Sequence, residues 1–185
     1  MSENDVKIIK MKVGKKKEYL EEEPDEIKNR KVTENWTFDE TSLSYENQYL
    51  NLCLIDENEN DESPSQSQIE IRRQINYKIH SYRSQDLKKN KYDESLFVNY
   101  DYVVSLLREK NMKCFYCKEN VMLLYNAVRE DKQWTLDRMD NSKGHNRGNV
   151  EIACLLCNLR RRTMYHERYV FTKQLNVVKM WLLHL

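Results

Sequence analysis

The stretch QWTLDRMDNSKGHNRGNVEIACLLCNLRRR, residues 133–162, holds two of the three glycines of the chain and two of its five cysteines. TLDRM (135–139) is typical of a strand, the turn-rich NSKGHNRGN (141–149) of a loop, and VEIAC (150–154) of a returning strand. The segment CLLCNLRRRTM (154–164) is typical of a helix. Residues 133–162 therefore predict a β-hairpin that leads directly into a helix.

Four of the cysteines form two Cys-x-x-Cys pairs, CFYC (Cys114, Cys117) and CLLC (Cys154, Cys157). Two such pairs match a tetrahedral site of four thiolates, in which each pair grips a zinc ion from a tight turn. Disulfides and redox catalysis compete with this interpretation, but a reducing compartment opposes the first and a redox site needs only one pair. Because four thiolates leave no position open for water, we expect a structural zinc.

The length and composition of the chain limit its size and location. A chain of 185 residues and 22.5 kDa can hold one compact domain with appendages, or two small domains. No apolar run approaches the roughly 18 residues of a membrane helix, and the start, MSENDVKIIK, lacks the apolar segment of a secretory signal. We therefore expect an intracellular protein with reduced thiols and no membrane contact, in the cytoplasm, the nucleus, or a viral factory or virion, and not a secreted one.

The formal net charge of +1 conceals an uneven distribution along the chain. Residues 1–65 carry 9 basic against 17 acidic side chains, and residues 66–185 carry 22 against 13. The basic part is what a phosphate backbone attracts, so nucleic acid, and DNA in particular, is the expected partner. The acidic leader could bind a basic protein partner or compete with nucleic acid for the basic surface, although ordinary solvated charge explains it equally well.

Residues 1–65 are predicted to be an acidic leader and linker of low order, because mixed charge runs end in the polar IDENENDESPSQSQ. One segment resists this description. In SYENQYLNLCLID, Leu50, Leu52 and Leu54 alternate with other residues, which indicates a short strand or a partner-binding peptide. Cys53 has no cysteine nearby, and we interpret it as a small buried or semi-buried hydrophobe rather than a metal ligand.

Residues 66–112 are predicted to form basic amphipathic helices. The apolar residues of the first recur at helical spacing, and SQDLKKNKYDES (84–95) follows as a loop. A second helix is expected from about Tyr100 to Lys110, with Asn99 as its N-cap. The C-terminal region, 165–185, is expected to be an amphipathic helix whose apolar stripe packs on the preceding module rather than forming a dimer seam. The stripe consists of Phe171, Leu175, Val178, Leu182 and Leu185.

Five elements of the chain, taken in order, resemble the HNH (His-Asn-His) endonucleases of the ββα-metal type, especially the HNH-like proteins of phages and large DNA viruses. The resemblance implies an α+β fold, with a zinc-stapled HNH-like module at 113–164, flanking helices and a largely irregular acidic N-terminal segment. The matching elements are CFYC, LDR, SKGHNRGNV, CLLCN and Arg161 or Arg162.

The resemblance also implies roles for individual residues. Asp137 and the side-chain oxygen of Asn158 would bind Mg²⁺ or Mn²⁺, as hard oxygen donors do, and Asn149 would brace the loop and orient the general base. The family's base is a histidine after the aspartate, but this chain has Arg138 there, and an arginine keeps its proton.

His145 is the best substitute on chemical grounds, because an imidazole titrates near neutral pH. Asp140 is the second candidate for this base. A structural interpretation stays open beside the catalytic one: His145 could hydrogen-bond the hairpin or contact phosphate. Likewise Asp137 could pair with a nearby arginine of the same motif.

The basic residues around the hairpin and the helix are expected to contact phosphates, whereas Trp134 and Tyr116 are expected to pack under the zinc. The expected function is that of an HNH-type nuclease that hydrolyses DNA with one divalent cation, or of a nuclease-derived nucleic-acid-binding protein. The alternative is a catalytically inactive zinc-binding structural or accessory protein in a larger assembly, such as a viral one. The expected phosphate contacts are Arg138, Lys143, Arg147, Arg160, Arg161 and Arg162.

Overall fold

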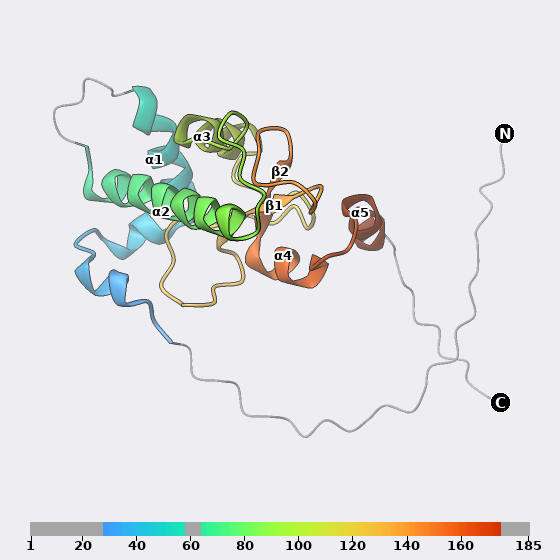
Figure 1. Ribbon diagram of the computed structural model, residues 1–185. Coiled ribbons are helices and arrows are strands. Elements are labelled where there is room, and N and C mark those ends of the chain that lie inside the picture. The colour runs from blue at the N-terminus through green and yellow to red at the C-terminus, as the bar shows by residue number, and fades with distance from the viewer. Residues whose placement is uncertain (1–27, 58–63, 175–185) are drawn as a thin grey trace, which may run out of the picture.

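The computed structural model describes residues 28–57 and 64–174, which include the predicted hairpin and helix (Figure 1). Strand β1 (Trp134–Arg138) pairs antiparallel with β2 (Val150–Cys154), and α4 (Leu155–Arg161) begins at the next residue. These elements confirm the ββα order predicted for residues 133–162. The described chain combines helices with this two-stranded sheet, as an α+β class requires.

The register of the hairpin decides which side chains share a face of the sheet. Asp137 lies opposite Glu151 on the neighbouring strand. Because side chains alternate along a strand, Thr135 and Asp137 point to one face, and Trp134 and Leu136 point to the other. Trp134 and Leu136 are both buried in the core.

Helix α2 (Gln66–Lys88) is the long basic helix predicted from the sequence. It begins with a capping box, in which the Ser65 side chain accepts from the backbone of Gln68 and the Gln68 side chain accepts from the backbone of Ser65. The predicted loop is wrong over residues 84–88, which continue the helix. The hydroxyl of Tyr82 accepts a hydrogen bond from the backbone N–H of Leu136, which joins α2 to the hairpin. The predicted apolar face of α2 is buried and consists of Ile71, Ile75, Ile79 and Tyr82.

Helix α3 (Tyr100–Glu109) connects the long helix to the first cysteine pair. The side chain of Asn99 accepts a hydrogen bond from the backbone of Tyr102 at 3.1 Å, which confirms the predicted N-cap. Its apolar residues are buried, as the sequence pattern predicts. These buried residues are Val103, Val104, Leu106 and Leu107.

The prediction of low order is wrong for the described part of the N-terminal segment. Two 3₁₀ turns, η1 (Lys31–Asn35) and η2 (Glu40–Leu43), lead into the α-helix α1 (Tyr45–Glu57). The strand or extended peptide expected around Leu50 and Leu52 is also wrong, because both residues lie on α1, with Leu52 buried and Leu50 56% exposed. Cys53 on the same helix is partly buried and unpaired, in keeping with its interpretation as a small hydrophobe.

Buried hydrogen bonds attach α1 to the segment that precedes the hairpin. The Oε1 atom of Gln48 accepts from the backbone N–H groups of Leu123 and Leu124, both at 2.8 Å. Its Nε2 atom donates to the carbonyl oxygens of Leu43 and Leu124. Gln48 is fully buried, and its bonds to Leu123 and Leu124 are shielded from water. A polar residue thus fixes α1 to the core.

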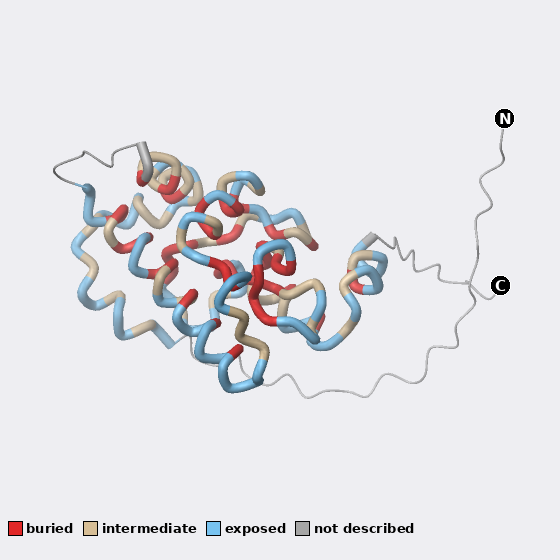
Figure 2. Tube along the Cα trace, turned by 45° about the horizontal axis from the view of Figure 1, so that its top comes forward, coloured by how far each residue is buried: buried red, intermediate tan, exposed pale blue. Residues whose placement is uncertain are grey.

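One continuous hydrophobic cluster joins α1, α2, α3, the hairpin and α5. It contains Leu52 of α1, Ile75 of α2, Leu107 of α3 and Trp134 of β1. Figure 2 shows the buried positions gathered toward the middle of the molecule. The helices that precede the zinc region and the hairpin therefore share a single core.

Helix α5 (His166–Gln174) follows α4 after a short turn. Its residue Tyr169 is buried, and its ring lies 4.8 Å from the ring of Tyr116. Phe171, the first residue of the predicted C-terminal apolar stripe, is 61% exposed. The other residues of that stripe, and residues 1–27 and 58–63 of the predicted leader and linker, lie outside the described residues. Among the described helices, none has the length and apolarity that crossing a membrane requires.

Replacement of Gln48 by leucine is expected to destabilise the protein strongly. The Gln48→Leu variant keeps the volume but leaves two backbone N–H groups and two carbonyl oxygens without their partner, at about 1–3 kcal/mol for each group that stays unsatisfied. We expect the free energy of unfolding to fall by about 3 kcal/mol or more in urea denaturation. The control is Leu50→Gln on the exposed side of the same helix, which should change it by less than about 0.5 kcal/mol. Equal stability of the two variants would show that the Gln48 bonds do not hold α1.

Candidate functional site

The four cysteines of the two Cys-x-x-Cys pairs come together in the structure. Their four Sγ atoms all lie within 4.8 Å of one another, and those of Cys117 and Cys154 are 3.9 Å apart. A tetrahedral zinc site with Zn–S bonds of about 2.3 Å has sulfur atoms about 3.8 Å apart. The cluster can therefore hold a metal ion, and its all-sulfur ligand set fits zinc. The cluster consists of the four expected ligands, Cys114, Cys117, Cys154 and Cys157, and zinc as the bound metal stays a prediction.

Local backbone geometry brings each cysteine pair into position. The first pair forms a tight turn in which Lys118 donates from its backbone to Cys114 and adopts a positive φ of 64°. The backbone N–H of Phe115 donates to the carbonyl oxygen of Ile152 at 2.7 Å, which fixes this turn against β2. In the second pair, Cys154 ends β2 and is the N-cap of α4, where its sulfur accepts from the backbone of Cys157. A bound zinc would link the segment after α3 to the junction of β2 and α4.

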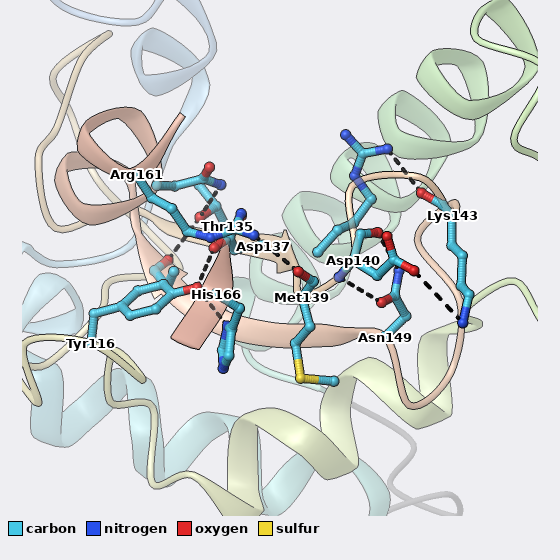
Figure 3. A network of polar contacts seen from close by, with 12 residues as sticks. Tyr116, Thr135, Asp137, Met139, Asp140, Lys143, Asn149, Arg161 and His166 are labelled. Carbon is cyan, nitrogen blue, oxygen red and sulfur yellow. Dashed lines mark hydrogen bonds and ion pairs between the residues drawn. The ribbon is translucent and has the colours of Figure 1, made fainter. Parts of the chain in front are cut away.

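Asp137, the expected magnesium ligand, is buried and already has partners for both carboxylate oxygens (Figure 3). Nη1 of Arg161 donates to Oδ1 at 2.8 Å, and the hydroxyl of Tyr116 donates to Oδ2 at 2.5 Å. Burial raises the pKa of Asp137, and the hydrogen bond from Tyr116 and the charge of Arg161 oppose that rise. The pairing of Asp137 with a nearby arginine, left open from the sequence, is the arrangement in the structure.

Asn158, the second expected magnesium ligand, lies on α4 with Arg161. Its Nδ2 atom donates to Oγ1 of Thr135 at 3.0 Å. Thr135 and Asp137 share one face of β1, so α4 covers that face with two residues three positions apart, as neighbours on a helix are. Arg161 supplies the positive charge beside Asp137 that a divalent cation would supply in a magnesium site. Binding of Mg²⁺ or Mn²⁺ by Asp137 and Asn158 stays a prediction.

Asn149 braces the loop between the strands, which is the role expected for it. Its Oδ1 atom accepts from the backbone of Asp140 at 3.0 Å, and its Nδ2 atom donates to the carbonyl oxygens of Asp140 and Gly144. Asp140 itself is exposed, and the hydroxyl of Ser142 donates to its carboxylate at 2.6 Å. Hydrogen bonding from Ser142 lowers the pKa of Asp140, which makes this carboxylate a weaker base.

His145 is buried against α2 rather than exposed on the loop. Its Nδ1 atom lies 2.9 Å from Oδ1 of Asp86, its backbone N–H donates to Oδ2 of the same residue, and its ring stacks on Tyr82. Burial lowers the pKa of His145 to about 4, and the attraction of Asp86 offsets only part of this effect. The side chain is thus held by Asp86 of α2, whereas the structural interpretation expected the hairpin or phosphate as its partner. Its role as a general base stays a prediction.

The six expected phosphate contacts divide into exposed and buried side chains. Arg161 is only 1% exposed and also donates to the carbonyl oxygen of Met139, so the prediction that it contacts phosphate is wrong in this structure. Arg138 is half-buried, and its guanidinium donates to the carbonyl oxygen of Lys143. The remaining four side chains are exposed: Lys143, Arg147, Arg160 and Arg162.

Two residues of this region carry a role that the sequence did not indicate. Tyr116 was expected only to pack under the zinc, but it hydrogen-bonds Asp137, and Nδ1 of His166 lies 3.0 Å from its hydroxyl. Burial and the bond to Asp137 raise the pKa of Tyr116, so its hydroxyl keeps the proton that it donates. Arg161, Asp137, Tyr116 and His166 thus form a chain of polar contacts from α4 through β1 to α5. In the sequence, only the position of Tyr116 between Cys114 and Cys117 could have indicated this role.

Comparison of the chain with protein-family models, with curated proteins and with solved structures found no match.

Loss of a zinc ligand is expected to remove the metal and unfold the region around it. The Cys157→Ser variant should bind less than one zinc per chain, because three thiolates and a hydroxyl make a weaker site, whereas wild type should bind one. Zinc content measured by atomic absorption and ellipticity measured during titration with a chelator test this. The control is Cys53→Ser, which should keep full zinc content because Cys53 lies outside the cluster. Full zinc content in Cys157→Ser would contradict the assignment.

Removal of Arg161 is expected to destabilise the protein because it leaves the carboxylate of Asp137 buried without its counter-charge. The Arg161→Met variant should lose about 3–5 kcal/mol of unfolding free energy in urea denaturation of the zinc-loaded protein. Replacing both partners, Asp137→Leu with Arg161→Met, should restore much of that loss. The exposed neighbour provides the control, since Arg160→Met should change stability by less than about 0.5 kcal/mol. Similar losses for the two single arginine variants would contradict the buried ion pair.

Proposed function

We propose that this protein binds nucleic acid through a zinc-stabilised, HNH-like ββα module that has no hydrolytic activity of its own. The observation that carries the proposal is the division of the arginine run that ends α4. Arg161 is buried, and its Nη1 atom lies 2.8 Å from Oδ1 of Asp137, while Arg160 and Arg162 are exposed. One side chain thus fills the place of the catalytic cation, and its neighbours are free to meet phosphate.

The arrangement of elements supports the HNH-like part of the proposal. Two antiparallel strands lead directly into a helix, and a Cys-x-x-Cys pair spans the junction of the second strand and the helix. Asn149 braces the loop between the strands, as the resemblance implies. Asp137 and Asn158 come from β1 and α4, which pack against each other, as the two metal positions of the resemblance require. The nuclease-derived interpretation rests on this agreement.

The chemistry of the site argues against hydrolysis. A divalent cation bound to Asp137 would lie within roughly 5 Å of the Arg161 guanidinium. Because this site is buried, the repulsion between the two positive charges would be strong. Arg138 stands at the position of the usual base and cannot accept a proton. His145, the proposed substitute, is buried and bonded to Asp86. Asp137 is therefore not free to bind a divalent cation, and neither Arg138 nor His145 is free to act as a general base.

The surface charge supports binding to a phosphate backbone. Lys143 and Arg147 of the loop expose their side chains to solvent, as do Arg160 on α4 and Arg162 at its C-cap. Such cations displace counter-ions from nucleic acid, which is a favourable and salt-dependent contribution to binding. DNA is the proposed ligand, and binding of a basic protein by the acidic leader is a further part of the proposal. An accessory role in a larger intracellular or viral assembly would use the same surface.

The test combines a cleavage assay and a binding assay on zinc-loaded protein. Supercoiled plasmid with Mg²⁺ or Mn²⁺ should stay uncut, while fluorescence anisotropy should show DNA binding that weakens linearly on a log–log plot against salt. The double variant Arg160→Ala/Arg162→Ala should reduce the salt slope by roughly 0.9 for each phosphate that the protein no longer neutralises. Arg73→Ala/Arg129→Ala removes the same charge from other exposed positions and is the matched control.

Two results would overturn the proposal. Metal-dependent nicking that disappears in Asp137→Ala would show that the site is a working nuclease, in which Arg161 moves away from Asp137. Absence of DNA binding by folded, zinc-containing protein at low salt would show that the exposed arginines serve another partner.

A further inference from the structure

The junction between α4 and α5 exposes arginines together with an aromatic ring. Within residues 159–168, the side chains of Arg160, Arg162, Tyr165 and Arg168 are all exposed, and we refer to these four as the α4–α5 junction. Glu167 is the only acidic residue in this part of the sequence. The junction therefore combines a net positive charge with an aromatic surface.

Tyr165 has an unusual degree of exposure for an aromatic residue. Its relative exposure is 79%, the highest among the large hydrophobic and aromatic residues that the structure describes as exposed. Its ring makes no aromatic or cation–π contact within residues 28–57 and 64–174. An open ring face, flanked in the sequence by exposed arginines, offers the aromatic surface and the positive charge that single-stranded nucleic acid binds.

The backbone of Arg162 adds an independent observation. This residue, the C-cap of α4, has φ 51° and ψ −117°, a conformation that glycine adopts more readily than any residue with a side chain. Residues held in such conformations occur preferentially at functional sites, where the side chain or the turn serves a purpose. The turn ends α4 and redirects the chain toward Tyr165.

The junction is held in place by the zinc region. His166 follows Tyr165 directly, and its ring lies 4.9 Å from the ring of Phe115 and within hydrogen-bond distance of Tyr116. One turn further along α5, Tyr169 packs its ring on Tyr116. Phe115 and Tyr116 lie between the two cysteines of the first pair, so α5 is docked on the metal site. Tyr165 is therefore carried on a fixed support, which reduces the conformational entropy lost on binding.

We propose that the α4–α5 junction binds single-stranded nucleic acid, with the ring of Tyr165 stacked on a base and Arg160, Arg162 and Arg168 on the flanking phosphates. The inference rests on the proposed nucleic-acid-binding function and specifies its ligand class. A single strand is favoured because stacking on Tyr165 requires an unpaired base, whereas the bases of a duplex are stacked on one another. Groove-reading contacts need no exposed ring.

The experiment measures the affinity of full-length, zinc-loaded protein by fluorescence anisotropy. The ligands are a single-stranded DNA of about 12 nucleotides, the duplex of the same sequence and the corresponding single-stranded RNA. Wild type should bind the single strands more tightly than the duplex at equal salt. Tyr165→Ala should weaken single-strand binding roughly 5- to 150-fold, the range found for loss of one stacked base. Tyr165→Phe should retain wild-type affinity because the ring is kept.

One control variant and one charge variant separate stacking from other effects. Tyr77→Ala removes a 69% exposed tyrosine from α2 and should leave affinity unchanged. Arg162→Gly removes the charged side chain but suits the backbone at that position, so it should weaken binding and reduce the salt slope while the protein stays folded.

The outcomes distinguish this inference from the function on which it rests. Equal binding of single strand and duplex, with Tyr165→Ala unchanged, would overturn the single-strand assignment and leave nucleic-acid binding intact. An equal loss in Tyr77→Ala and Tyr165→Ala would also overturn it. Absence of binding to all three ligands by folded wild type would overturn the proposed function itself.

Discussion

The convergence of four cysteine thiols is the constraint on which the rest of this structure depends. The sheet has only two strands of five residues, and an isolated hairpin of this size is marginally stable in water. The cysteine cluster joins the end of β2 and the start of α4 to the turn that follows α3. A metal ion bound there would contribute directly to folding, because no preformed site exists in the unfolded chain. The link to α4 and to the turn after α3 can therefore stabilise a hairpin that is too small to be stable alone.

The helix packed on β1 determines what the site can do. Asp137 needs a partner because it is buried, and α4 can bring either a metal-binding amide or a cationic side chain to it. In this structure the guanidinium of Arg161 takes that place, and Asn158 bonds Thr135 instead. Tyr116 completes the environment of the carboxylate by donating to its second oxygen.

Features fixed by neighbouring residues could be predicted from the sequence. The hairpin, α4, the apolar face of α2, the Asn99 cap and the cysteine cluster all follow from spacing and local residue types. Helix α1 could not be predicted, since its attachment depends on Gln48, a polar residue whose partners lie 75 and 76 positions away. The alternation of Leu50, Leu52 and Leu54 is typical of one face of a strand. In the structure all three lie on α1, and only Leu52 is buried.

The candidate site was less predictable than the fold, because burial decides the role of its polar residues. The sequence does not show that His145 is bonded to Asp86, because the two residues are 59 positions apart. The three consecutive arginines were equivalent in the sequence, and only the packing of α4 on β1 distinguishes them. Successive residues of a helix are about 100° apart, so a helix that turns Arg161 onto Asp137 must turn Arg160 away from it. Arg162, the C-cap of α4, has a non-helical backbone conformation that ends the helix. Neutralisation of the carboxylate by Arg161 and exposure of Arg160 and Arg162 to solvent are therefore consequences of a single helix orientation.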